Sequence, residues 1–141
     1  EANYNQDMTP YNIPFTACHE LSHLRGFMQE EEANFIAWLA CKDAPETELQ
    51  YSGSMLAWIH CMNVLYEEDR AAWSEIREIL SEEADVDLRE NSKFWDKWDG
   101  AVAEVSEQIN DNYLKANGQK DGVQSYGRMA DLVVAYYLWE E

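Results

Sequence analysis

The sequence predicts a mainly α-helical fold in one domain that spans residues 1–141. Three observations carry this prediction. Apolar residues recur at the spacing of an amphipathic helix, whereas no segment alternates with period two for long enough to predict a strand. Glycine and proline fall mostly between the helical segments. A chain of 141 residues, 46% of them hydrophobic, has the length of one domain and enough apolar surface for a core.

The first predicted helix follows an extended or looped lead-in over residues 1–13. Pro14 suits the first turn of a helix, where its missing N–H group is not needed. Gly26 suits the left-handed position that ends a helix. We therefore expect a helix over about residues 14–25.

The later helices are separated by turn signals, such as Pro45 and the pair Asn117-Gly118. Their expected bounds are about 29–42, 52–68, 70–81, 86–99, 101–116 and 124–139. In the third helix, the stripe at helical spacing consists of Met55, Leu56, Ile59, Asn63 and Tyr66. In the last helix, the residues expected to be buried are Met129, Leu132, Val133, Tyr136 and Tyr137.

The net charge of −18, from 10 basic and 28 acidic residues, limits the class of partner. Such a surface repels phosphate backbones and anionic lipid heads, so we expect no nucleic-acid partner. It suits cations, although excess acid also simply solubilises a helical protein.

Cys18, Cys41 and Cys61 are odd in number and form no C-x-x-C motif. They predict buried thiols and neither a disulfide framework nor a thiolate zinc site.

The chain contains no membrane-spanning segment by sequence, because no stretch approaches 18 uncharged apolar residues. We therefore expect the chain itself to be soluble. It begins at Glu1, without a methionine or a signal-like segment, which suggests a fragment of a longer protein. The sequence does not indicate an oligomeric state.

The stretch HELSH, residues 19–23, has the HExxH pattern. A helix turns about 100° per residue, so His19 and His23 share one face, one turn apart. Two imidazoles at this spacing can take adjacent corners of a tetrahedral metal site. Glu20 lies beside them and can reach a metal-activated water without being a ligand, as a general base must. The sequence therefore predicts a Zn²⁺ site.

A catalytic zinc site needs a third protein ligand and an open position. The candidates are Glu30, Glu31 and Glu32 in the helix expected over about 29–42. Glu30 shares its side of the helix with small residues, which let a neighbouring helix approach, whereas Glu32 falls on a stripe expected to face the core. We choose Glu30 as the ligand, with Glu31 and Glu32 left open, and expect Asn34 to support a histidine ring as an outer-shell partner.

These residues predict the hydrolysis of a peptide or protein substrate. Glu20 would take a proton as water attacks the carbonyl and pass it to the leaving amine. The developing oxyanion needs a donor, and Tyr126 and Arg128 are favoured over His60 for this role. Polar side chains at a helix start are also often only solvated, which is the simpler interpretation of Tyr126 and Arg128.

The run HELSHLRGFMQEEEANFIAWLAC resembles the signature of an uncharacterised bacterial family of zinc metallopeptidase type, catalogued as a domain of unknown function. The lead-in EANYN with IPFTACHE and the stretch DNYLKANGQKDGVQSYGRMADL are also similar to that family, so the resemblance covers nearly the whole chain. It implies an HExxH zincin on the gluzincin-like side. It also implies membrane anchoring through segments outside this chain, in the bacterial cell membrane, with this domain extracytoplasmic.

The resemblance carries over His19 and His23 as zinc ligands and Glu20 as base. Glu30 with Asn34 is similar to the E-x-x-x-D pattern of gluzincins, with Asn in place of Asp. Zincins usually carry a sheet before the active-site helix, and its edge strand pairs with the substrate. Only 18 residues precede His19, so we expect that sheet to be absent from this chain.

Other functions remain open at this point. A catalytically inactive zincin-like domain could act as a binding module. A carboxylate di-metal bundle would need a second E-x-x-H, but Ala57 stands three residues before His60. Manganese or cobalt would also accept these ligand types, although two histidines and a glutamate favour zinc. The two histidines could also be ordinary core or surface residues.

Overall fold

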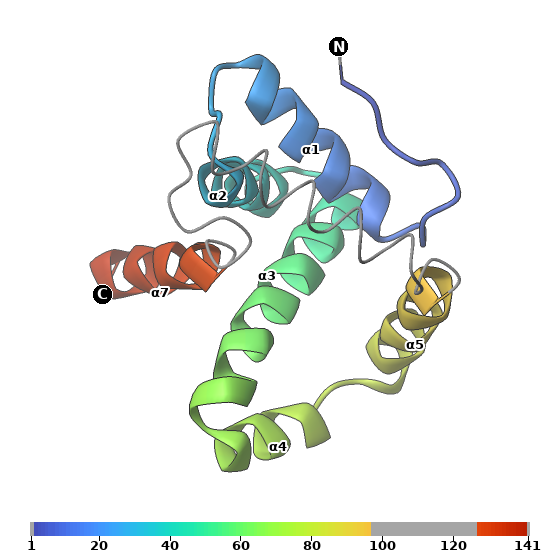
Figure 1. Cartoon of the computed structure of the whole chain (residues 1–141), viewed down its shortest axis with the longest axis vertical. Coiled ribbons are helices and arrows are strands. Elements are labelled where there is room, and N and C mark those ends of the chain that lie inside the picture. The colour runs from blue at the N-terminus through green and yellow to red at the C-terminus, as the bar shows by residue number, and fades with distance from the viewer. Residues whose placement is uncertain (1, 97–126, 141) are drawn as a thin grey trace.

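The computed structural model describes residues 2–96 and 127–140, and over these ranges the protein is built from helices without strands (Figure 1). This confirms the predicted mainly α-helical class. The helices are α1 (Asn12–Leu24), α2 (Glu30–Lys42), α3 (Thr47–Glu68), α4 (Arg70–Glu78), α5 (Glu82–Asp96) and α7 (Arg128–Glu140). Among the described residues, no helix combines the length and the apolar character that crossing a bilayer requires.

Three helices form the centre of the fold. Helices α1 and α2 pack against each other and against α3, and α7 lies against α2 and α3 (Figure 1). Beyond this cluster, α3 continues to α4, and α5 returns the chain toward the start of α1 (Figure 1). There the Asn91 side-chain oxygen accepts hydrogen bonds from Thr9 Oγ1 at 3.0 Å and from Asn12 Nδ2 at 2.7 Å.

The main core joins one side of each of the four packed helices. Its buried residues are Phe15, Ala37, Trp38, Cys41, Ala57, Met129 and Val133. Helices α2 and α3 approach closely because Gly53 has no side chain: a Cβ atom there would lie 2.5 Å from Cβ of Cys41. The small residues that share the Glu30 side of α2 are thus buried at a helix contact, as the sequence predicted.

Helix α1 is fixed at its start by a side chain from α3. Its N-cap residue, Tyr11, provides no side-chain cap. Instead Ser52 Oγ accepts a hydrogen bond from the Phe15 N–H at 3.0 Å and donates a short one to the Tyr11 carbonyl. The Ser52 hydroxyl therefore bonds both groups of the first i to i+4 pair of α1, Tyr11 C=O and Phe15 N–H. The helix begins at Asn12, two residues before the predicted start at Pro14.

Three other predicted boundaries were wrong by several residues. Helix α4 ends at Glu78, three residues before the predicted end at 81. Helix α3 begins at Thr47, five residues before the predicted start, because the N–H groups of Leu49 and Gln50 already donate to the Glu46 carbonyl. Helix α5 begins at Glu82 rather than 86, because Ser81 Oγ accepts the Ala84 N–H at 3.2 Å and so starts this helix. The helix predicted over 101–116, and residues 97–99 and 124–126, lie outside the described residues.

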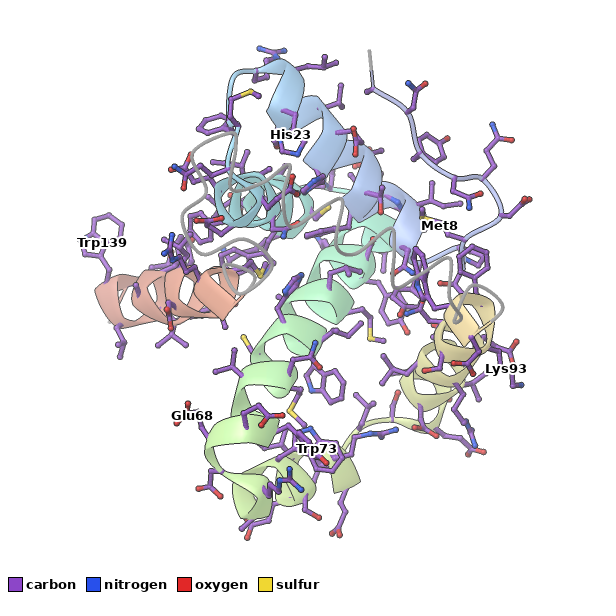
Figure 2. All side chains as sticks on the ribbon, in the orientation of Figure 1. Met8, His23, Glu68, Trp73, Lys93 and Trp139 are labelled. Carbon is purple, nitrogen blue, oxygen red and sulfur yellow. The ribbon has the colours of Figure 1, made fainter. Side chains whose placement is uncertain are left out.

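The apolar stripes predicted in α3 and α7 are buried only where these helices reach the main core. Met129 and Val133 are buried in α7, but Tyr137 is exposed, because α7 presents that side to solvent. Trp139, at the end of α7, projects away from the other helices (Figure 2). In α3, Asn63 and Tyr66 are also exposed, because this half of the helix continues past the α1–α2 pair.

Candidate metal centre

The loop between α1 and α2 reverses the direction of the chain directly after His23. Gly26 has φ +102°, the left-handed conformation predicted for it, and ends α1 with two hydrogen bonds. The Gly26 N–H donates to the His23 carbonyl at 3.0 Å, and the Phe27 N–H donates to the Ser22 carbonyl at 3.2 Å. This turn folds the chain back so that α2 starts beside the last turn of α1.

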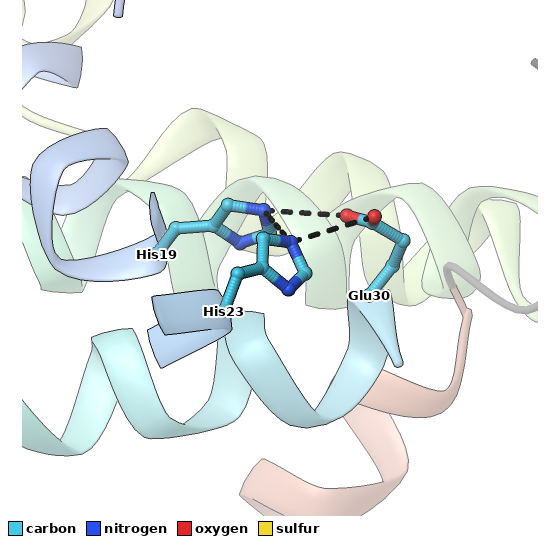
Figure 3. A group of neighbouring side chains, drawn as sticks. All are labelled: His19, His23 and Glu30. Atoms are coloured by element: carbon cyan, nitrogen blue, oxygen red, sulfur yellow. Dashed lines mark hydrogen bonds and ion pairs between the residues drawn. The ribbon is translucent and has the colours of Figure 1, made fainter. Parts of the chain in front are cut away.

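His19, His23 and Glu30 converge where these two helices meet (Figure 3). The two histidine Nε2 atoms lie 3.0 Å apart. The Glu30 carboxylate lies 3.3 Å from Nε2 of His19 and 3.5 Å from Nε2 of His23. All three side chains are partly buried, and their candidate ligand atoms lie within 4.8 Å of one another. The structure therefore brings together the three residues predicted as ligands.

The Phe27 carbonyl sets the tautomer of His23. It lies 2.7 Å from Nδ1 of His23, and because a carbonyl can only accept, Nδ1 donates. The Nε2 lone pair of the neutral ring is then directed at His19 and Glu30. A backbone carbonyl on the far nitrogen is the usual outer-shell partner of a metal-binding histidine.

His19 is held differently. Its Nδ1 atom is buried and has no hydrogen-bond partner among the residues that the structure describes. Asn34 is buried in α2, but in the described part of the chain no hydrogen bond joins it to either histidine. Its outer-shell role therefore stays a prediction.

The donor set fits a small divalent cation. A tetrahedral zinc site with bonds of about 2.0–2.2 Å places neighbouring donor atoms about 3.3 Å apart, close to the separations found here. Without a cation, a proton on Nε2 of His19 can be shared with Glu30. This hydrogen bond holds the pKa of the Glu30 carboxyl below its usual value, against the opposite effect of partial burial. Two imidazoles and one carboxylate are also the ligand types that favour zinc.

The carboxylates of Glu31 and Glu32 do not join the cluster of His19, His23 and Glu30. Glu32 is exposed, so its expected core-facing position was wrong. The buried side of α2 instead includes Ala37 and Trp38. Glu31 is only 4% exposed, and its Oε1 lies 3.1 Å from Nη1 of Arg128. This pair was not predicted from the sequence, although Glu31 is about 20° from Trp38 on a helical wheel, on the side of a large apolar residue.

The remaining predicted site residues are only partly placed. Glu20 lies in α1 directly after His19, partly exposed, and has no ion pair with the other described residues. Tyr126 lies outside the described residues. Arg128 begins α7 and bonds Glu31, so at least one of its N–H groups is engaged away from any substrate. Its role at an oxyanion stays a prediction, as does that of Tyr126.

His60 lies apart from the histidine pair, in the middle of α3. It lines a cavity of about 330 Å³ between α3 and the start of α7. The other lining residues are Asn63, Val64, Glu67, Glu68 and Gly127. Among the described residues, the one group of histidine, cysteine and carboxylate side chains arranged for a metal ion is His19, His23 and Glu30.

Comparison with known proteins identifies a family without a described activity. A family model described as "Protein of unknown function (DUF3810)" matches residues 1–134. A search of curated proteins found no match, and a search of solved structures found none either. Because the match covers nearly the whole chain, the chain belongs to the DUF3810 family.

Proposed function

We propose that this protein is a zinc-dependent metallopeptidase domain of the zincin type. The observation that carries the proposal is the convergence of two histidine Nε2 atoms and one carboxylate within 3.0–3.5 Å of one another. They belong to an HExxH helix and to the helix that follows it. Three protein ligands leave an open position, as catalytic zinc sites do and structural ones do not.

In this proposal His19, His23 and Glu30 hold the ion. Zinc would supply Lewis acidity and lower the pKa of a coordinated water to about 7. Glu20, next to His19 and partly exposed, takes a proton on its carboxylate and returns it to the leaving amine. The Phe27 carbonyl holds the His23 ring in place during these steps.

The proposed substrate is a peptide or protein. The surrounding protein is strongly acidic, which favours cationic over anionic substrates in diffusional encounter. The resemblance to membrane-anchored bacterial zincins supports a further part of the proposal: the domain works outside the cytoplasm, attached through segments outside this chain.

A second candidate function is a zincin-like domain that binds a partner without catalysis. It is favoured by the lack of any strand within residues 2–96 and 127–140 that could pair with an extended peptide. Exposed apolar side chains would suit such a role, and Leu138 and Trp139 are 69% and 83% exposed. Zinc binding without hydrolysis would favour this alternative.

A peptidase assay tests the main proposal. The zinc-loaded protein is incubated with a mixture of fluorogenic peptides, and the same assay is run on Glu20→Gln and on Glu32→Gln. Loss of a general base lowers turnover by about 10²–10⁴-fold, so Glu20→Gln should be nearly inactive. Glu32 is exposed and outside the metal cluster, so its variant should match the parent. Equal activity in the parent and in Glu20→Gln would contradict the assigned base.

A further inference from the structure

The ion pair between Glu31 and Arg128 joins the last helix to the residue beside the third proposed ligand. The Glu31 side chain is 5% exposed and that of Arg128 is 50% exposed. The second carboxylate oxygen of Glu31 is buried and has no hydrogen-bond partner in the described ranges. A carboxylate held this deeply needs a counter-charge, because unpaired burial of a charge is strongly unfavourable.

Docking of α7 does not depend on this ion pair. Met129 and Val133 are buried in the main core, with Met129 fully enclosed. Farther along the helix, the Tyr136 ring meets Trp38 edge-to-face with centroids 5.1 Å apart, and its hydroxyl lies 3.1 Å from Nζ of Lys42. The ion pair is therefore one of several contacts that hold α7, and the half-exposed Arg128 side chain provides the counter-charge for a buried carboxylate.

Among the described residues, the only other ion pairs in the first turn of α2 are those of Glu30 with the two histidines. Its N-cap residue, Gln29, makes no side-chain cap, and three adjacent carboxylates repel one another there. Arg128 provides the counter-charge for the buried member of the three, with its Nη1 atom 3.1 Å from Oε1 of Glu31. Glu30 is the preceding residue of the same turn, and its carboxylate oxygens lie 3.3 and 3.5 Å from Nε2 of His19 and of His23.

We infer that Arg128 is a positioning residue for the metal centre, acting through Glu31 to hold the turn from which Glu30 reaches His19 and His23. This inference rests on the proposed metal site. In this role Arg128 acts on a metal ligand through Glu31, whereas the role predicted from the sequence was a contact with the substrate. Outer-shell residues of this kind typically contribute 10–100-fold to metal affinity.

The test measures metal binding in the whole chain, with zinc affinity from chelator competition and ligand geometry from the visible spectrum of the cobalt(II) form. Arg128→Gln should bind zinc about 10–100-fold more weakly and shift the cobalt bands. Arg128→Lys keeps the charge and should recover most of the affinity. The double variant Glu31→Gln with Arg128→Gln lacks the same ion pair, so it should bind zinc about as weakly as Arg128→Gln, without a further additive loss.

Met129→Ala is the control, because it loosens α7 in the core without touching Glu31. It should lower the melting temperature and leave the cobalt spectrum unchanged. If Met129→Ala shifted the spectrum as much as Arg128→Gln, or if Arg128→Gln bound zinc like the parent, the positioning role would be refuted while the metal site stood. A parent chain that binds no zinc would overturn the metal site and the inference together.

Discussion

Polar side chains are paired differently in the arm formed by α4 and α5 and in the α1–α2 pair. In the arm formed by α4 and α5, local partners are close at hand: Asp69 caps α4 by accepting the N–H groups of Ala71 and Ala72 at 3.1 and 3.0 Å. Asp85 accepts from both Arg77 and Arg89. At the α1–α2 pair neither helix has a side-chain N-cap, and two imidazole nitrogens and a carboxylate face one another.

This difference suggests that the charges of the arm serve stability, whereas those of the α1–α2 pair serve the proposed function. The arm follows the ordinary rules of capping and ion pairing, so its charges are accounted for by local stability and solubility. The α1–α2 pair gathers two imidazoles and a carboxylate, with a second buried carboxylate beside them. Departures from local rules of this kind are expected where a protein holds a functional group.

The largest effect should come from the core that supports the α1–α2 pair. Trp38 is 3% exposed, and replacing a buried tryptophan by alanine costs about 3–5 kcal/mol of unfolding free energy. Trp95 in the arm is 51% exposed, and Trp95→Ala should cost less than about 1 kcal/mol. Chemical denaturation of both variants tests the contrast. Similar losses would contradict the idea that only the α1–α2 end holds the main core.

Metal should stabilise the α1–α2 end selectively. A ligand at a thousand times its dissociation constant adds about 4 kcal/mol to the unfolding free energy. We expect this gain from zinc in the parent and in His60→Ala, and none in His23→Ala. Hydrogen exchange should show the added protection first in α1 and α2. A gain that survived in His23→Ala would place the ion elsewhere.

A smaller effect on stability is expected from alanine substitutions at two glycines. Gly53 lies at the close contact of α2 and α3, whereas Gly127 has room for a side chain. Gly53→Ala places a Cβ 2.5 Å from that of Cys41, and such overpacking costs about 1–3 kcal/mol. This should outweigh the gain of about 1 kcal/mol in helix propensity. At Gly127 a new Cβ meets Val64 at an ordinary 3.8 Å, so Gly127→Ala should be neutral or stabilising. Thermal melts of the two variants decide this.

The smallest effect concerns pH in the arm. The hydrogen bond from Arg77 holds the pKa of the Asp85 carboxyl below its usual value. A lowered folded-state pKa adds stability above the unfolded value, about 3.9, which is lost as the pH falls through the folded value. Asp85→Asn should therefore melt below the parent at pH 7, with the gap closing below about pH 4. A gap that stayed constant with pH would rule out this ion pair as its source.

Much of the fold was predictable from the sequence, because helix periodicity and stop signals are local. Gly26 ended α1 as expected, and α2 began within one residue of its predicted start. The hydrogen bond from the Phe15 N–H to Ser52 in α3 was not predictable. That contact depends on tertiary packing, which no local pattern contains.

The candidate site was predictable for a related reason. The spacing of His19 and His23 fixes their shared face, and the small residues beside Glu30 indicated which side of α2 meets a neighbour. The pairing of Glu31 with Arg128 joins residues 97 positions apart, so the sequence could not show it. It is the contact on which the positioning role inferred for Arg128 rests.

Elemental analysis tests the central claim most directly. The purified chain, supplied with zinc and then freed of excess, is compared with folded His23→Ala and Glu30→Ala, and with Glu32→Ala as a matched control. We predict about one zinc per chain in the parent and in Glu32→Ala, and loss of that zinc in the other two variants. A folded parent without zinc, or one that keeps it in Glu30→Ala, would contradict the proposed site.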